Sequence, residues 1–150
     1  MGGLHRGPRR LGATHLLGDG DAPLWTTTPL ALDGGGAMVS WETGMPPLRK
    51  VWTALRRMGQ WQDSMLMAEG AEADTAALSP SGNALVAWST AHRVYGRYHS
   101  LGRGWGPAQL ALGDNGGVSD LCAFIGGQGR GWILWINGGP MRLRAAPIAE

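Results

Sequence analysis

One tryptophan-bearing segment occurs three times at a constant spacing, and this repetition constrains the fold more than any other feature of the sequence. Each copy places a glycine-rich turn before a short apolar run that ends in tryptophan. The three tryptophans are 47 residues apart, at Trp41, Trp88 and Trp135. A constant period of this length indicates that one supersecondary unit is repeated along the chain.

The apolar runs are predicted to be β-strands. In the first run, Ala37, Val39 and Trp41 alternate with Met38 and Ser40, as side chains on the two faces of a strand do. In the third run both faces are apolar, which predicts a strand covered by a layer on each side. Glycine, proline and asparagine before the runs favour tight turns.

The segment 51–78 has a competing helical interpretation. Val51, Leu55 and Met58 fall at helical spacing, and the segment contains few helix breakers. Residues 94–110 align with residues 51–66, however, and their glycines and proline are incompatible with a helix. Because repeated units share a fold, strands are the favoured prediction for both segments.

A helix-free unit of this length fits one blade of a β-propeller, so we expect an all-β fold of about three antiparallel blades. A β-sandwich is the alternative. The whole chain, 1–150, is then a single repeat domain. Its predicted parts are the end of a preceding blade, a first repeat, a second repeat and a partial third repeat, at residues 1–36, 37–83, 84–130 and 131–150.

The two ends of the chain are complementary in this scheme. Residues 7–11 resemble residues 106–110, the outer piece that the third repeat lacks, and could complete the last blade. Three blades cannot close a ring, because propellers have about four to eight. A homodimer would complete a six-blade ring. The alternative is an open piece of a larger propeller.

Composition excludes several classes of protein. The net charge of +2 argues against a nucleic-acid partner, and the absence of a long apolar run argues against a membrane span. The single cysteine, Cys122, cannot form an internal disulfide, and its apolar surroundings predict burial. Four scattered histidines have no metal-ligand spacing, so neither a metal nor another cofactor is expected.

No catalytic motif is visible, so a non-enzymatic protein is the favoured prediction. The least favoured alternative is a propeller glycoside hydrolase that uses Asp33, Asp74 or Asp120. Such an enzyme needs two carboxyl groups held at a set separation, which sequence spacing alone does not establish.

The tryptophans fall into two sets. Trp41, Trp88 and Trp135 recur in the core strand and are predicted to pack between blades. Trp61 and Trp105 follow glycine and basic residues in turns, where partial exposure is expected. An aromatic ring beside an arginine suits a sugar. The predicted ligand-binding residues are Trp61, Tyr95, Arg97 and Trp105.

The second copy also carries a resemblance. GNALVAWS at residues 82–89, followed by VYGRYHSLGRGWGPAQL at 94–110, resembles the GNA-x-AVW and GWG repeats of uncharacterised secreted or cell-surface bacterial proteins. The first and third copies share mainly the core strand. The resemblance implies β-propeller-like repeats and an extracellular location, although the first residues lack the apolar stretch of a secretion signal.

Two functional hypotheses follow. The first is a lectin-like propeller module that binds a carbohydrate or another cell-surface polymer, without catalysis. The second is a structural or protein-interaction part of a larger propeller, in which blade surfaces pack on other blades.

Overall fold

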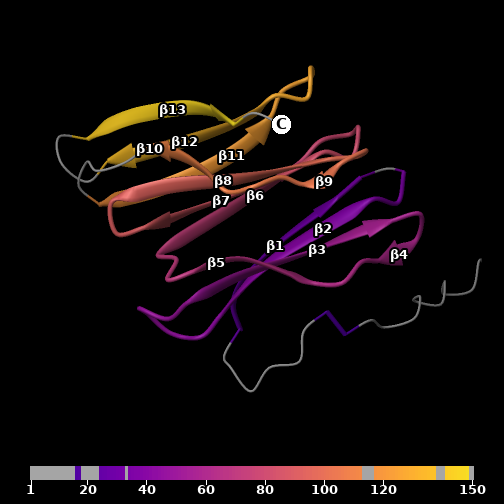
Figure 1. Ribbon diagram of the computed structural model, residues 1–150, viewed down its shortest axis with the longest axis horizontal. Coiled ribbons are helices and arrows are strands. Elements are labelled where there is room, and N and C mark those ends of the chain that lie inside the picture. Colours follow the sequence, from indigo (N-terminus) through magenta and orange to yellow (C-terminus); the bar gives the residue numbers. More distant parts are fainter. Residues whose placement is uncertain (1–15, 18–23, 33, 113–116, 138–140, 149–150) are drawn as a thin grey trace, which may run out of the picture.

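The computed structural model describes residues 16–17, 24–32, 34–112, 117–137 and 141–148, and within them the regular structure consists of β-strands alone. The strands form three antiparallel sheets, which we call sheets A, B and C in chain order. The sheets are stacked on one another, with sheet B between the other two (Figure 1). The all-β prediction is confirmed.

Sheets A and B share one plan: the first three strands pair in chain order, and a two-residue strand and a last strand both pair with the third strand. Sheet A consists of β1 (Leu24–Ala31), β2 (Ala37–Thr43), β3 (Lys50–Arg57), β4 (Gln60–Trp61) and β5 (Met65–Glu69). Sheet B consists of β6 (Ala73–Leu78), β7 (Ala84–Thr90), β8 (Arg93–Ser100), β9 (Gly104–Trp105) and β10 (Gln109–Leu112).

Sheet C consists of β11 (Val118–Ile125), β12 (Gly131–Asn137) and β13 (Arg142–Ile148). The three sheets begin at Leu24, Ala73 and Val118. The predicted repeats begin at the core strands β2, β7 and β12, so each sheet begins one strand before its predicted repeat. Leu24–Ala31 pairs with β2 and is therefore part of sheet A. Residues 7–11 lie outside the described residues.

The three spaced tryptophans occupy the same place in their sheets. Trp41, Trp88 and Trp135 are each the fifth residue of a seven-residue strand, β2, β7 and β12 respectively. All three side chains are buried, with exposed fractions of 6%, 5% and 3%. Trp88 and Trp135 pack between sheets as predicted, but the prediction is wrong for Trp41, which lies on the face of sheet A turned away from sheet B.

Sheet B is covered on both faces because it lies in the middle of the stack. Val86 and Trp88 join the apolar cluster shared with sheet A, whereas Leu85 and Ala87 join the cluster shared with sheet C. From Ala84 to Ser89, every residue of β7 is buried. A strand with apolar side chains on both faces is stable only in such a position.

The prediction of two covering layers is wrong for the third core strand. In β12, Ile133 and Trp135 face sheet B and are buried, but the alternating residues on the outer face are only half-buried. The reason is that sheet C is the last sheet of the described stack. The buried position predicted for Cys122 is also wrong, because Cys122 points to the same exposed outer face from β11.

Close approach of sheets B and C depends on a residue without a side chain. A Cβ atom added at Gly96 in β8 would lie 2.7 Å from Cδ1 of Ile133 in β12, which is closer than real Cβ contacts come. Large side chains opposite this glycine, including Ile133 and Ile148, fill the space between the sheets.

The helical alternative for residues 51–78 is wrong, because this segment forms β3, β4, β5 and β6. The described residues also include no helix long and apolar enough to span a bilayer.

We predict that Trp88→Ala lowers the free energy of unfolding by about 3–5 kcal/mol, the usual loss when a buried aromatic ring is removed. Trp132→Ala should cost much less, because the Trp132 ring lies on the half-buried outer face of β12. Chemical denaturation of both variants checks this. Equal losses would contradict the assignment of the sheet A–sheet B interface as core and the outer face of sheet C as periphery.

Candidate functional site

Three of the four predicted ligand-binding residues lie on one face of sheet B, the face that packs on sheet A. The Tyr95 ring stacks on Trp88, with centroids 5.8 Å apart and an interplanar angle of 16°. Arg97 donates a hydrogen bond of 2.9 Å from Nε to the Gly106 carbonyl oxygen. Trp105 packs against the sheet A–sheet B cluster. All three predicted residues are half-buried and take part in packing within the stack.

Trp61 does not join them. It lies in β4 of sheet A, paired with Arg56, at the position that Trp105 holds opposite His99 in sheet B. The structure therefore places the two turn tryptophans at corresponding positions of different sheets, and the four predicted residues do not form one site.

Trp61 lines an open pocket of about 660 Å³ where one end of sheet A meets the β6–β7 turn of sheet B. The pocket wall comes from the turn before β2, from the β3–β4 hairpin and from Pro80, Ser81 and Gly82. Its surface is mainly apolar, with Leu55 and Leu78 among the lining residues. An apolar concavity with a few convergent polar groups is the usual form of a ligand site.

The β3–β4 hairpin brings an unusual residue to the pocket. Met58 and Gly59 both have positive φ, 47° and 81°, as a tight two-residue hairpin turn requires. Glycine adopts this conformation freely, but a large side chain does so at a cost. Met58 is nevertheless fully exposed and lines the pocket. Leu101, 59% exposed, lines it from sheet B.

Two pocket arginines have only neutral groups as hydrogen-bond partners among the described residues. Arg56 donates from Nη1 to the Gly35 carbonyl oxygen at 2.9 Å, and Arg57 donates from Nη2 to the Gly82 carbonyl oxygen at 3.5 Å. Neither arginine forms an ion pair with a described carboxylate. Both guanidinium groups are therefore available to attract an anionic ligand.

Arg57 also lies against His99, with Nη2 3.1 Å from each imidazole nitrogen. Burial, together with the positive charge of Arg57, lowers the pKa of His99 to about 4. His99 is thus neutral at pH 7 and adds no second positive charge beside Arg57. The rings of His99 and Trp105 pack edge to face, with centroids 5.1 Å apart. Trp105 therefore packs on His99, which in turn contacts Arg57.

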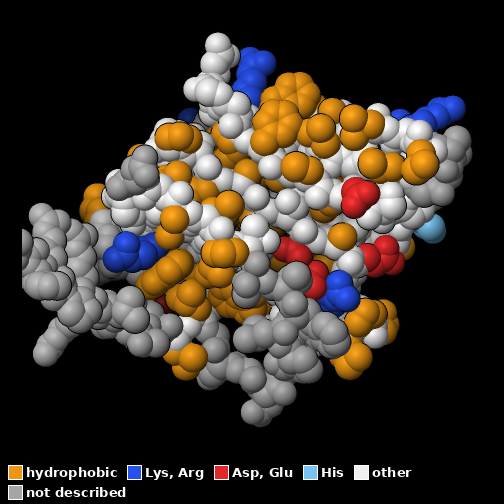
Figure 2. Space-filling view, turned by 180° about the vertical axis from the view of Figure 1, so that it is seen from behind, with side chains coloured by type: hydrophobic (Ala, Val, Ile, Leu, Met, Phe, Trp, Pro, Cys, Tyr) orange, Lys and Arg blue, Asp and Glu red, His pale blue; other side chains and the backbone are white. Residues whose placement is uncertain are grey.

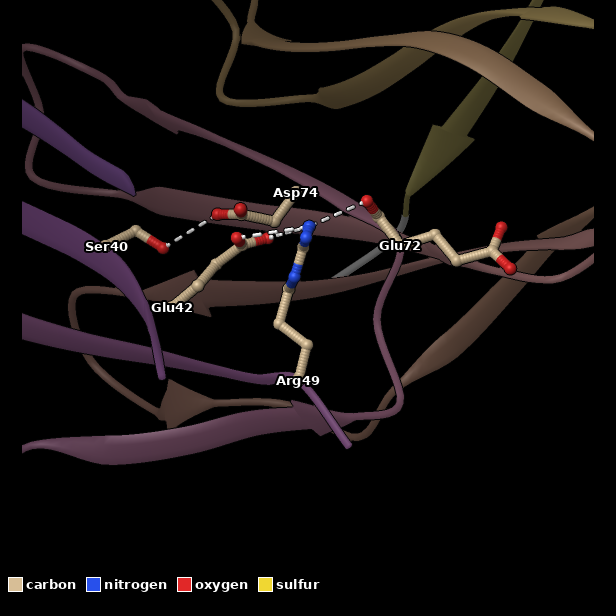
Figure 3. A network of polar contacts seen from close by, with 5 residues as sticks. All are labelled: Ser40, Glu42, Arg49, Glu72 and Asp74. Atoms are coloured by element: carbon tan, nitrogen blue, oxygen red, sulfur yellow. Dashed lines mark hydrogen bonds and ion pairs between the residues drawn. The ribbon is translucent and has the colours of Figure 1, made fainter. Parts of the chain in front are cut away.

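A second polar cluster joins sheets A and B near the start of β3 (Figure 3). Ser40 donates from Oγ to Oδ2 of Asp74 at 3.2 Å. Arg49 forms an ion pair of 3.3 Å with Oε2 of Glu42 and donates to the Glu72 carbonyl oxygen at 3.0 Å. Burial raises the pKa of Asp74 to about 7, and the hydrogen bond and negative charge of Glu42 add to this effect.

Asp74 and Glu42 bring two carboxyl groups together, as an acid–base pair requires. In this cluster Glu42 is 3% exposed and Asp74 is half-buried. Neither carboxyl group lines the pocket described above. The arrangement therefore suits the joining of two sheets by a shared proton and an ion pair. Sequence reasoning considered Asp74 but missed Glu42, which is far from it in sequence.

Neither of the other two acidic residues considered for catalysis is placed beside Asp74 by the structure. Asp120 lies in β11 on the exposed outer face of sheet C, and Asp33 lies outside the described residues. Among the residues that the structure describes, no three histidine, cysteine, aspartate or glutamate side chains gather closely enough to hold a metal ion.

Comparison of the chain with protein family models, with curated proteins and with solved structures gives no match.

We predict that Asp74→Asn raises the free energy of unfolding at pH 8. In the folded protein Asp74 holds its proton up to about pH 7, whereas in the unfolded chain it loses the proton near pH 3.8. The folded state therefore binds more protons between these values, and the Asp74 contribution weakens as pH rises from about 4 to 7. Asparagine avoids burying a second negative charge beside Glu42.

His99 acts in the opposite direction. Its folded-state pKa of about 4 lies below the ordinary value of 6.5, so its contribution is lost as pH falls from about 6.5 to 4. Removing Asp74 should therefore make stability rise more steeply with pH. Denaturation from pH 4 to 8 tests this, with the exposed Asp63→Asn as the matched control. Identical pH profiles for Asp74→Asn and the original protein would contradict it.

Proposed function

We propose that this protein is a non-enzymatic binding module made of propeller-type blades, and that it binds a carbohydrate polymer bearing acidic groups. The ligand site is the pocket between sheets A and B. The observation that carries the proposal is that Trp61, Arg56 and Arg57 line one open pocket, with both arginines paired only to neutral groups among the described residues.

The blade interpretation rests on the stacking of the sheets. Each sheet is a small antiparallel meander, and the middle sheet buries both of its faces. A propeller packs every blade between two others, whereas a two-sheet sandwich leaves one face of each sheet to solvent. The sandwich accounts less well for a strand such as β7.

The chemistry of the pocket supports a sugar acid. An exposed aromatic face packs on the C–H groups of a pyranose ring, and a guanidinium forms paired hydrogen bonds with a carboxylate. Gln60 and Gln62, both exposed at the pocket, add amide groups suited to hydroxyls. In this proposal Trp61 contacts the ligand, while Trp105 acts indirectly, through His99 and Arg57.

Tyr95 and Arg97 have a different place in the proposal. Tyr95 contacts Trp88 and Arg97 contacts Gly106, on the face of sheet B that packs on sheet A. In the proposal these contacts stabilise sheet B beside the pocket and do not touch the ligand. Their substitution should affect stability more than ligand contact.

A role in protein interaction is the second candidate, and one observation favours it. The outer face of sheet C leaves Phe124 43% exposed and Leu143 71% exposed. Exposed apolar surface of this kind marks a contact with another protein surface.

We predict that the protein binds an oligogalacturonate, which carries carboxylates, more tightly than an uncharged cello-oligosaccharide of equal length. Arg56→Gln removes one guanidinium group and should weaken oligogalacturonate binding by about tenfold, as expected for a charged hydrogen bond. Trp61→Ala should weaken binding of both sugars if both use the aromatic face. Isothermal titration calorimetry measures the affinities.

The matched control is Arg103→Gln, which removes an exposed arginine that does not line the pocket. It should leave the affinity unchanged, and higher salt should weaken binding of the acidic sugar alone. Equal affinity for the two sugars would contradict the acidic preference. Equal losses from Arg56→Gln and Arg103→Gln would contradict the pocket as the site.

A further inference from the structure

The outer face of sheet C is an apolar surface without a covering layer among the described residues. The register places three residues from each strand on it, in three rows across the sheet. These residues are Asp120, Ile136 and Leu143, then Cys122, Leu134 and Ala145, then Phe124, Trp132 and Pro147. Asp120 is the only charged member, and apolar side chains gather over this upper part of the molecule in Figure 2.

Two aromatic rings form the most prominent part of this face. Phe124 and Trp132 are paired across β11 and β12, and their rings stack with centroids 6.4 Å apart and an interplanar angle of 8°. Phe124 is 43% exposed. A rigid, exposed aromatic pair is the kind of surface that anchors a protein–protein contact.

Corresponding positions in the other two sheets are covered. The pair Phe124–Trp132 corresponds by register to Ala77–Leu85 in sheet B and to Leu30–Met38 in sheet A. Ala77 and Leu85 belong to the cluster between sheets B and C, and Leu30 and Met38 to the cluster between sheets A and B. The outer face of sheet C is therefore the same face that carries the next sheet elsewhere in the stack.

At the opposite end of the stack, one side of β1 is exposed. In β1, Pro29 and Ala31 are exposed and pair with Val39 and Ala37.

The residues at these positions in the other first strands are packed. In sheet B they are Ala76 and Leu78, which pack on sheet A, and in sheet C they are Ala123 and Ile125, which pack on sheet B. On this face of sheet A, Pro29 and Ala31 of β1 are thus exposed, whereas Trp41 of β2 and Ala54 of β3 are buried.

From the outer face of sheet C and the exposed side of β1 we infer that a second copy of this chain docks by β1 on the outer face of sheet C. Within one chain, β6 lies against β1 and β2, and β11 lies against β6 and β7. The same step repeated once more places β1 of the second copy against β11 and β12 of the first. Two such contacts related by a two-fold axis close a ring of about six sheets, within the size range of propellers. This inference does not depend on the ligand of the pocket.

Light scattering behind a sizing column tests the inference on the purified full chain. We expect twice the chain mass of 15.8 kDa for the original protein. Phe124→Glu, which charges the sheet C face, and Ala31→Glu, which charges the exposed side of β1, should each give the monomer mass. Leu48→Glu is the matched control, because Leu48 is 75% exposed in the loop before β3 and should leave the dimer intact.

Mixing the two charged variants sharpens the test. The unchanged β1 of Phe124→Glu can still dock on the unchanged sheet C of Ala31→Glu, so the mixture should recover a dimer through one contact. Circular dichroism and thermal unfolding establish that both variants are folded. A monomeric original protein would overturn the inference. So would a dimer that Phe124→Glu disrupts and Ala31→Glu does not, since that result indicates pairing of two sheet C faces.

Discussion

The packing of sheet B between sheets A and C is the interaction on which the rest of the structure depends. β7 has apolar side chains on both faces and buries nearly all of them. Such a strand cannot exist in an isolated sheet, because one face would remain in water. The bare backbone at Gly96 lets sheet C approach closely, and Trp88 fills the space toward sheet A. The stack is therefore one cooperative unit of at least three sheets.

Polar contacts join sheet A to sheet B at the two ends of β3. Glu42 and Arg49 meet Asp74 near its start, whereas Arg57 meets His99 at its end. Both titratable partners have shifted pKa values, in opposite directions, because each is removed from water. The pocket lies at the Arg57 end, so its width follows the spacing of the two sheets. A ligand bound there, as we propose, would contact both sheets.

The repeat pattern in the sequence predicted the strands because local patterns determine them. Turn residues and alternating apolar residues recur before each tryptophan, and the strands appear where that pattern lies. The face to which a residue points was harder to predict when both neighbours are apolar. Cys122 lies between Leu121 and Ala123, and only the register of β11 shows that it faces outward.

The candidate site was predictable only in part, because it is built from residues far apart in sequence. Trp61 was identified from its position in a turn. Arg56 and Arg57 were not, because the groups that hold them at the pocket, Gly35, Gly82 and His99, come from other segments of the chain. Glu42 resembles any strand residue in sequence, and its pairing with Arg49 and its effect on Asp74 depend on the stacking of two sheets.

The distribution of charge at the ends of the described stack bears on the docking that we infer. A chain that remained a monomer would protect its terminal sheet faces with charged side chains, which oppose association. The outer face of sheet C carries Asp120 alone among charged residues, together with a stacked pair of aromatic rings. The exposed side of β1 presents Pro29 and Ala31, which are small and uncharged. The exposed side of β1 and the outer face of sheet C thus carry few charges, and a further sheet on sheet C would bury its outer face as the inner sheets are buried.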